Sequence, residues 1–306
     1  MVRDRGRLDV LVACALAACT DVNDGPPPVW TPWDQLEGEF RPELVQVEPA
    51  PAPPERLRVV SYNVLEGIDV DEDAAFFAGH ADLASADVIA LQEVRRRAGA
   101  PAADAADFAQ RLGMGYAFLP AYVQDGDLEG VALVSRFPLR DVQILRLRDE
   151  GAGDLEMAAR VALRATIDTA RGPIRVVNVH LDVRLNVPER VLQLRPAVID
   201  LPSPAAVLGD FNTNDYVWFA ERIPIRPLDA VASTSQADAL DEYMRAIGFA
   251  TPTAYFGDTW HGSPEDQRLD AVFTRGLRSS SGGVERRLHT SDHWPIWLDV
   301  RIPAPR

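Results

Sequence analysis

The sequence contains no lysine, and all 31 basic side chains are arginine. A chain without a side-chain primary amine cannot form a Schiff base with a carbonyl substrate or with pyridoxal phosphate, and it lacks the lysine of a phosphate-binding loop. The 46 acidic residues give a formal net charge of −15, which argues against a broad basic surface that coats nucleic acid or anionic lipid. Salt screens charges beyond about 8 to 10 Å, so a local pocket of arginine, histidine and a divalent cation is still compatible with a phosphate substrate.

Cysteine is also nearly absent, and both copies stand near the N-terminus. Arginines at positions 3, 5 and 7 precede an apolar run, Val10 to Ala18, in the charge-then-apolar order of a secretory signal. The run is too short for a bilayer core, which needs about 20 residues. It ends Leu16-Ala17-Ala18-Cys19, which resembles the lipobox of bacterial lipoproteins, where the cysteine is lipidated and becomes the new N-terminus.

We therefore expect residues 1–18 to be a signal peptide and Cys19 to anchor the mature chain in the bacterial cell envelope, facing the periplasm or the exterior. The alternative is a disordered N-terminus with a chance Ala-Ala-Cys. Residues 19–56 contain nine prolines and are predicted to be a stiff, extended tether that holds the domain at 57–306 off a membrane. Large aromatic side chains are unusual in a free tether, so Trp30, Trp33 and Phe40 leave open whether this segment docks on the domain.

From Leu57 onward, short apolar runs typical of strands alternate with alanine-rich runs typical of helices. Several predicted strands follow one another without a helix between them, so we expect mixed or antiparallel sheets in one α/β domain. The predicted strands are 57–64, 87–94, 116–123, 130–137, 160–167, 174–181, 205–211, 269–274 and 295–302, and the predicted helices are 73–86, 104–112, 188–199 and 236–247.

Polar residues that a buried strand does not favour stand at or beside the ends of six apolar strands. A charge within an apolar strand costs several kcal/mol unless it is paired or bound to metal, so these groups are expected to share a cation. Carboxylates with an asparagine suit Mg²⁺ or Mn²⁺, whereas two histidines without an available cysteine argue against structural zinc. Taken singly, each residue also fits a surface carboxylate, an Asx turn or a core histidine. They are Asn63, Glu93, His180, Asp210, Asn212, Asp270, Asp292 and His293.

The order of these residues resembles the endonuclease/exonuclease/phosphatase superfamily, the deoxyribonuclease I-like proteins. The resemblance rests on Gly-Asp-Phe-Asn at 209–212, Arg-Leu-Asp at 268–270 and Ser-Asp-His-Trp-Pro at 291–295, and it covers the chain from residue 57. It implies a four-layered α/β sandwich, with two mixed β-sheets packed face to face and helices outside. It also implies hydrolysis of a phosphate ester with Mg²⁺ or Mn²⁺ at one edge of the sheets.

The resemblance also assigns roles to the metal and base residues. Glu93 would bind the divalent ion, with Asn63 beside it and Asp292 close to the metal. Asp210 would orient and deprotonate the attacking water, while Asn212 would hold that carboxylate and a phosphate oxygen. These assignments agree with what ester hydrolysis requires, namely a base for the water and positive charge on the phosphate oxygens.

The remaining roles fall on two histidines. His293, oriented by Asp270, would stabilise the phosphate in the transition state. His180 would contact the phosphate or assist the leaving group, and Arg184, four residues further on, is expected to reach the phosphate. Some family members carry a carboxylate at the position of Leu65, so an arrangement with a second metal that depends on this acid is in doubt here.

We expect a phosphodiesterase that acts on nucleic acid or phospholipid headgroups, with inositol phosphates as a further possible substrate, from a chain that is a monomer. A lipid-hydrolysing member would need an exposed apolar hairpin; the only candidate is the apolar triplet 217–219, which we expect to be buried in the core. The alternative from another functional class is a surface lipoprotein that uses the same fold as a binding module without catalysis. The presence of all eight polar positions favours the enzyme.

Overall fold

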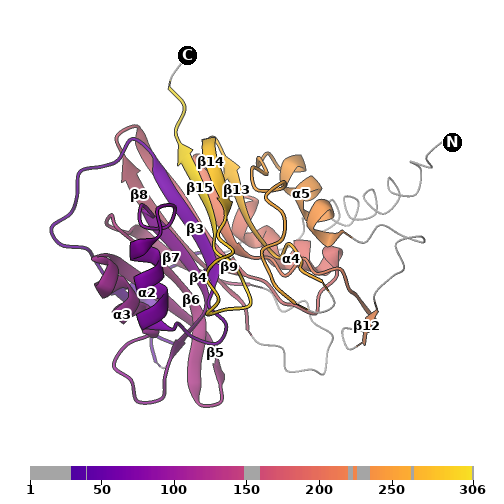
Figure 1. Cartoon of the computed structure of the whole chain (residues 1–306), viewed down its shortest axis with the longest axis horizontal. Helices are drawn as coiled ribbons and strands as arrows, with labels where there is room; N and C mark the ends of the chain where they lie inside the picture. Colours follow the sequence, from indigo (N-terminus) through magenta and orange to yellow (C-terminus); the bar gives the residue numbers. More distant parts are fainter. Residues whose placement is uncertain are drawn as a thin grey trace.

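In the computed structural model the described residues are 29–38, 40–147, 159–219, 223–225, 235–262 and 265–304. Within these ranges the chain forms two large β-sheets, with helices outside them (Figure 1). The predicted signal peptide and Cys19 lie outside the described residues. Among the helices that are described, none has the length and apolar character needed to cross a bilayer.

The larger sheet has seven strands in the order β14-β15-β3-β4-β6-β5-β2. The neighbours β3 and β4 are parallel, and every other neighbouring pair in this sheet is antiparallel. Its strands are β2 (Glu43–Val45), β3 (Leu57–Asn63), β4 (Val88–Arg96), β5 (Gly115–Gln124), β6 (Asp127–Ser135), β14 (Arg278–Val284) and β15 (Ile296–Arg301).

The second sheet has six strands in the order β1-β7-β8-β9-β10-β13, and here β9 and β10 are the parallel pair. A separate two-stranded sheet pairs β11 with β12. These strands are β1 (Thr31–Pro32), β7 (Arg140–Arg146), β8 (Val161–Thr169), β9 (Gly172–His180), β10 (Ala205–Asp210), β13 (Asp270–Arg275), β11 (Val217–Phe219) and β12 (Ile223–Ile225), with a 3₁₀ turn, η1, at Trp33–Gln35.

Alternating side chains on the strands let each sheet bury both of its faces. In β3, Leu57 and Val59 belong to the core between the sheets, whereas Val60 and Tyr62 pack with the helices on the other face. The helices α2 and α3 cover the seven-stranded sheet, and α4 and α5 cover the six-stranded sheet. The predicted four-layered sandwich with two mixed sheets is therefore confirmed. The helices are α2 (Val70–Gly79), α3 (Asp104–Leu112), α4 (Val187–Val198) and α5 (Gln236–Ala246).

All nine predicted strands and four predicted helices are present, with differences at their ends. The largest difference is at α2, which was predicted at 73–86 and forms at Val70–Gly79. It begins earlier because the Asp69 carboxylate accepts a hydrogen bond from Glu72 N and caps the helix, and it ends at Gly79, where His80 takes an extended conformation. Strands β1, β2, β7, β11, β12 and β14 were not predicted. Strand β14 is rich in serine and glycine and lies at the sheet edge, where a strand has no need of an apolar pattern.

Two short strands lie within the segment predicted to be a tether, and each forms the edge of a sheet. Strand β1 pairs with β7, and β2 pairs with β5. The indole of Trp30 stacks under the Arg164 guanidinium at 4.0 Å, and Trp33 packs against the core between the sheets. Of the two outcomes left open for the aromatic residues, docking on the domain is the one observed.

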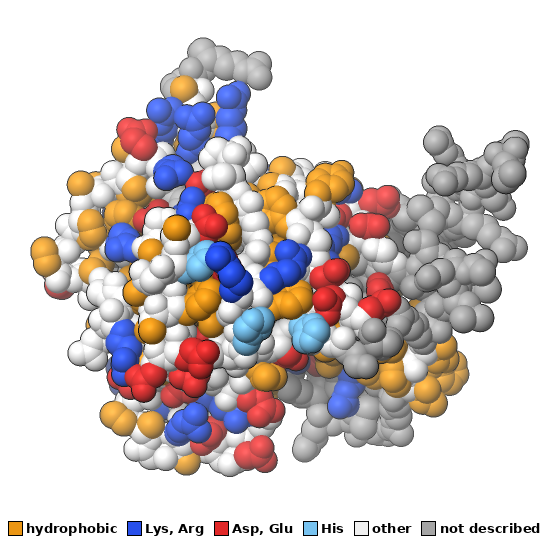
Figure 2. Space-filling view, in the orientation of Figure 1, with side chains coloured by type: hydrophobic (Ala, Val, Ile, Leu, Met, Phe, Trp, Pro, Cys, Tyr) orange, Lys and Arg blue, Asp and Glu red, His pale blue; other side chains and the backbone are white. Residues whose placement is uncertain are grey.

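The β11–β12 hairpin exposes an apolar face, so the expected burial of residues 217–219 in the core is wrong. The cross-strand pairs Val217–Ile225 and Phe219–Ile223 place four apolar side chains on one face of the hairpin. All four are exposed, and Phe219 is the most exposed of them at 65 %. Trp218 has the opposite orientation and is half-buried. Hydrophobic side chains at the lower right of Figure 2 lie where Figure 1 shows β12.

Candidate active site

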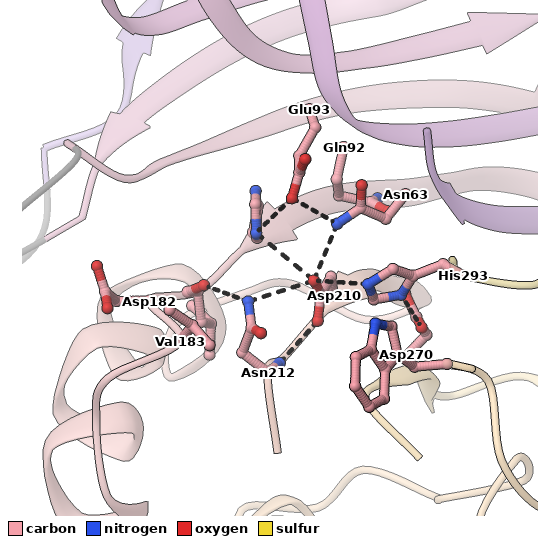
Figure 3. Close-up of polar contacts among 12 residues, drawn as sticks. Asn63, Gln92, Glu93, Asp182, Val183, Asp210, Asn212, Asp270 and His293 are labelled. Atoms are coloured by element: carbon pink, nitrogen blue, oxygen red, sulfur yellow. Dashed lines mark hydrogen bonds and ion pairs between the residues drawn. The ribbon is translucent and has the colours of Figure 1, made fainter. Parts of the chain in front are cut away.

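Strand direction brings the predicted site residues to one edge of the sandwich. Asn63 and His180 end the strands β3 and β9, and Asp210 ends β10, which runs parallel to β9. Asp270 begins β13, which is antiparallel to β10, so its first residue lies at the same edge. In the register, Asp210 is directly opposite both His180 and Asp270. Residues that are far apart in sequence therefore meet around one carboxylate (Figure 3).

Asp210 is the centre of the site and is almost completely buried. The preceding Gly209 allows β10 to approach β9 closely, since a Cβ there would lie 2.0 Å from the carbonyl oxygen of Val179. Asp210 Oδ1 accepts a hydrogen bond from Asn212 N at 2.8 Å. Its Oδ2 accepts one from Asn63 Nδ2 at 3.1 Å and another from Asn212 Nδ2 at 3.2 Å. Both oxygens are therefore fixed in direction before a substrate arrives.

A β-bulge directs the Glu93 side chain toward Asn63, whose amide also contacts Asp210. The register of β4 against β6 shifts between Gln92 and Val94, and Glu93 takes a left-handed backbone conformation with φ of 60°. This is a costly conformation for a residue other than glycine, and such conformations cluster at functional sites. Glu93 Oε1 accepts a hydrogen bond from Asn63 Nδ2 at 3.0 Å, and Oε2 accepts one from Glu66 N at 3.0 Å.

His293 and Asp270 form a buried pair, with 2.8 Å between Nδ1 and Oδ2. The other ring nitrogen, Nε2, lies 3.8 Å from Asp210 Oδ2. Burial acts to lower the pKa of His293, but the Asp270 and Asp210 carboxylates outweigh it and raise the pKa to about 10. Main-chain N of Asp270 donates to Thr259 Oγ1 at 2.9 Å, which holds the acid of the pair in place. The His293 ring is thus an imidazolium at neutral pH.

The pKa of His180 is shifted in the opposite direction to that of His293. Its Nε2 lies 3.5 Å from Asp210 Oδ2 and 3.9 Å from Glu93 Oε1. Burial, followed by the charges of Arg160 and His293, holds its pKa well below the usual value. The site therefore contains one cationic and one neutral histidine on either side of Asp210.

The pKa of the Asp210 carboxyl lies near neutral pH. Burial raises the pKa of its carboxyl to about 7, with His293 opposing this shift and Asp270 adding to it. A base is most effective when its pKa lies near the working pH, because it is then both ionised and able to take a proton. The environment of Asp210 therefore matches the predicted role as the base.

The donor set on one side of Asp210 fits a hard divalent cation. The amide nitrogen of Asn63 donates to both Glu93 and Asp210, so oxygens of two carboxylates converge on one point. Among the described residues, no arginine forms an ion pair with either carboxylate. Carboxylate oxygens are the ligands that Mg²⁺ and Mn²⁺ prefer.

A second set of possible ligands is less suitable. Asp210, Asp270 and His293 offer ligand atoms within 4.8 Å of one another. However, a histidine must be neutral to bind a metal, and His293 carries a charge and donates Nδ1–H to Asp270. The Glu93 side of the site therefore fits a metal better.

Two predicted residues lie outside this hydrogen-bonded centre. The Asp292 carboxylate accepts a hydrogen bond from Trp260 Nε1 at 2.8 Å, and within the described ranges it makes no polar contact with Asn63 or Glu93. Arg184 is exposed, and its main-chain N donates to Asp182 Oδ1 at 2.8 Å. The roles of Asp292 and Arg184 stay predictions.

The sequence analysis missed Arg160, whose guanidinium NH1 lies 3.1 Å from His180 Nδ1. Strand β8 pairs antiparallel with β9, with Ala162 opposite Val179, and this register brings residue 160 to the end of β9 where His180 stands. The sequence did indicate that Arg160 lies near His180, because the predicted strands 160–167 and 174–181 are joined by a short turn that contains Gly172 and so form a hairpin.

Comparison with known proteins agrees with this fold. The model of the endonuclease/exonuclease/phosphatase family matches residues 60–293, and the chain belongs to that family. Its members are in general hydrolases of phosphate esters that use divalent metals. A search of curated proteins finds no match to the sequence.

Solved structures of low sequence identity have the same fold. An endonuclease/exonuclease/phosphatase from Beutenbergia cavernae is 22 % identical with a TM-score of 0.63, and the match covers 81 % of this chain and 72 % of that one. A family protein from Leptotrichia buccalis is 16 % identical with a TM-score of 0.59, covering 81 % and 100 %. The catalytic domain of human Nocturnin with a bound sulfate anion is 16 % identical with a TM-score of 0.54, covering 87 % and 98 %.

Proposed function

We propose that this protein is a divalent-metal-dependent phosphodiesterase. The observation that carries the proposal is the position of Asp210, between the Glu93 carboxylate with its Asn63 partner on one side and the His293 imidazolium on the other (Figure 3). A base with a pKa near 7 thus lies between a site that suits a cation and a fixed positive charge. Hydrolysis of a phosphate diester needs these three elements together.

In this proposal each group has one task. A Mg²⁺ or Mn²⁺ ion held by Glu93, with Asn63 beside it, would neutralise charge on the phosphate oxygens. Asp210 takes a proton from the attacking water, whose oxygen bonds to phosphorus while the ester bond to the leaving group breaks. Asn212 holds the Asp210 carboxylate in direction, and His293 stabilises the charge that develops on the phosphate.

The test is hydrolysis of bis-p-nitrophenyl phosphate by a chain beginning at Val29, with Mg²⁺, with Mn²⁺ and with a chelator. We expect the chelator to abolish activity, and we expect Asp210→Asn and His293→Ala each to lower kcat by about 10² or more. His289→Ala, which removes an exposed histidine four residues before His293, is the matched control and should leave kcat unchanged. Activity that survives the chelator and both site variants would overturn the proposal.

A second class of function, a binding module without catalysis, makes a different prediction. Such a protein would turn over no member of a panel of plasmid DNA, phosphatidylcholine, sphingomyelin and inositol phosphates. It would still bind a phosphate ester in the presence of the metal. The panel therefore separates the two functions as well as the substrates.

The exposed β11–β12 face favours a phospholipid headgroup as one candidate substrate. Asn214 connects this hairpin to the site, because its Nδ2 donates to the main-chain oxygen of Asn212 at 3.0 Å and its Oδ1 accepts from Trp218 Nε1 at 3.4 Å. An apolar surface next to a phosphodiesterase site suits a substrate that is presented at a lipid surface. Nucleic acid remains the other candidate, and it needs no such surface.

The envelope location is a separate proposal that rests on the sequence of residues 1–19. Labelled palmitate should be incorporated into the native protein expressed in a bacterium, and Cys19→Ser should abolish the label. Equal behaviour of the two proteins would remove the lipid anchor from the proposal without affecting the catalytic site.

A further inference from the structure

Asp73 is a buried carboxyl group that the proposed mechanism does not use. It lies in the first turn of α2 and is 1 % exposed, next to Ala74 in the apolar cluster that the helices form with the seven-stranded sheet. Among the described residues, neither an arginine nor a histidine pairs with it. Burial raises the pKa of Asp73 to about 6, and hydrogen bonds from Thr290 and Tyr62 oppose this shift only in part. The ionised carboxylate therefore costs folding stability that an apolar side chain in its place would not.

The Asp73 carboxylate is the end of a short chain of hydroxyl groups. Tyr62 Oη lies 2.9 Å from Thr290 Oγ1, and Thr290 Oγ1 donates a hydrogen bond to Asp73 Oδ1. Tyr62 Oη also lies 3.4 Å from the same carboxylate oxygen. Each hydroxyl has one hydrogen to donate, whereas an ionised carboxylate only accepts. Asp73 therefore fixes the direction of both hydroxyl groups.

The two hydroxyl residues stand beside site residues in the sequence. Tyr62 precedes Asn63 at the end of β3, and Thr290 begins the loop that ends at His293. A second contact joins the same two parts of the chain. Ser291 Oγ donates to the main-chain oxygen of Asn63 at 2.7 Å and accepts a hydrogen bond from His293 N at 3.0 Å. The loop is therefore attached to β3 at two consecutive residues.

We propose that Asp73 is a positioning residue that, through its two hydroxyl partners, holds the loop 290–293 against the end of β3. It thereby sets the place of His293 relative to Asp210, with 3.8 Å between Nε2 and Oδ2. A displacement of about 1 Å at such a group can lower a rate about 10²-fold. The effect on catalysis rests on the proposed function, whereas the attachment of the loop does not.

The first test is hydrogen exchange of main-chain amides in the metal-free full chain, measured by NMR. Asp73→Ala should speed exchange of the His293 amide, which is bonded to Ser291 Oγ, about tenfold or more. Thr290→Val removes the hydroxyl, keeps the shape of the side chain and should have the same effect. Asp73→Asn keeps the oxygen that both hydroxyls contact and should exchange at the native rate. An exchange rate that Asp73→Ala or Thr290→Val leaves unchanged would overturn the proposal.

Asp69 gives a matched control on the same helix. Its carboxylate caps α2 by accepting a hydrogen bond from Glu72 N at 3.1 Å, and within the described ranges its side chain makes no hydrogen bond to the loop 290–293. Asp69→Ala should therefore weaken α2 through loss of the cap, yet leave both kcat and the exchange of the His293 amide unchanged. An effect as large as that of Asp73→Ala would show general loosening of the helix and contradict the positioning role.

Kinetics on bis-p-nitrophenyl phosphate with saturating Mg²⁺ test the consequence for catalysis. Asp73→Ala should lower kcat about tenfold or more and change KM less than about twofold, because His293 acts in the transition state. Asp73→Asn should keep the native kcat. In a His293→Ala background, Asp73→Ala should lower kcat by less than about twofold, since the group that it positions is gone. Equal lowering in both backgrounds would indicate a general loss of structure and overturn the proposal.

The two proposals fail separately. If the native chain hydrolyses no diester, the phosphodiesterase is contradicted, and the exchange rates still decide the role of Asp73. If Asp73→Ala turns over as fast as the native chain, the positioning role is contradicted and the phosphodiesterase stands. If Asp73→Ala does not fold, Thr290→Val decides with the same two measurements.

Discussion

The amide of Gln92 donates a hydrogen bond from Nε2 to Oδ1 of Asn178 at 2.7 Å, and this contact joins the two sheets in the middle of the core. Asn178 Nδ2 donates in turn to the carbonyl oxygens of Leu91 and Ala132, each at 2.8 Å. Gln92 immediately precedes Glu93, and Asn178 stands two residues before His180. A buried polar network of this kind fixes the relative position of the strands that carry the site.

Replacing Asn178 by alanine should lower the free energy of unfolding by about 3 kcal/mol or more. The side chain is fully buried, and its loss removes one hydrogen bond from the Gln92 amide, which keeps its contact with Ser61, and one from each of two strand carbonyls, at a cost of about 1 kcal/mol or more for each bond. Urea denaturation measures the change. Asn186→Ala is a matched control, because Asn186 also makes two hydrogen bonds, to Trp218, but is only partly buried. A loss for Asn178→Ala no greater than the loss for this control would contradict the prediction.

The pH dependence of catalysis should follow His293. If its imidazolium is required, activity falls as the pH rises through the raised pKa of about 10. Asp270→Asn removes the largest influence that raises this pKa, so the alkaline limb should move to lower pH, and kcat/KM at pH 7 should fall about 10² or more. A pH–rate profile at saturating metal measures both. Asp266→Asn is the matched control, since the exposed His261–Asp266 pair has a similar separation of 2.7 Å.

Folding stability offers a check on this pair that needs no substrate. The folded-state pKa of His293 is raised above the ordinary histidine value of 6.5, so its stabilising contribution is complete below pH 6.5 and disappears as the pH rises to about 10. The stability deficit of Asp270→Asn should therefore shrink between pH 6.5 and 10. A deficit that is constant over this range would show that His293 is not charged in the folded protein.

The N-terminal segment should contribute to the stability of the domain. Glu43 on β2 accepts hydrogen bonds from Tyr116 Oη at 2.9 Å and from Ala103 N at 3.1 Å, and it pairs with Arg96. A fragment beginning at Glu55 loses these contacts together with two edge strands, so its Tm should be several degrees below that of a chain beginning at Val29. Glu43→Gln in the longer chain keeps the strand and should lie between the two. Equal Tm values for the two fragments would restore the free-tether interpretation.

Central strands of this fold were predictable from the sequence, whereas edge strands were not. Central strands such as β3 and β10 bury both faces and so appear as apolar runs, and a polar residue such as Asp210 at the end of a run is conspicuous. Edge strands carry no such pattern: β14 is mostly serine and glycine, and β2 lies in a proline-rich segment. Their pairing depends on the rest of the fold, which a local pattern does not contain.

Site residues at strand ends were predictable in the same way, whereas the direction of a side chain in a loop was not. Strand ends fix where Glu93, His180 and Asp270 lie, because strand direction in the sheets sets the edge they share. Side-chain direction in a loop has no such constraint, and the Asp292 carboxylate contacts Trp260. Arg160 was missed because an arginine before a strand is ordinary in sequence, and only the pairing of β8 with β9 gives it a partner.

The apolar face of the β11–β12 hairpin should decide between a lipid substrate and a soluble one. Phe219 and Ile223 are 65 % and 56 % exposed, so replacing both by serine should change the free energy of unfolding by less than about 1 kcal/mol. If the substrate is a phospholipid, the double variant should hydrolyse phosphatidylcholine vesicles about tenfold more slowly, because less apolar surface enters the bilayer. Its rate on bis-p-nitrophenyl phosphate should be unchanged, since the site is not altered. Tyr255→Ser, which removes an aromatic side chain that is 91 % exposed elsewhere on the surface, is the matched control. Equal rates of the double variant and the native chain on vesicles would exclude a role for the hairpin and favour a soluble diester such as nucleic acid.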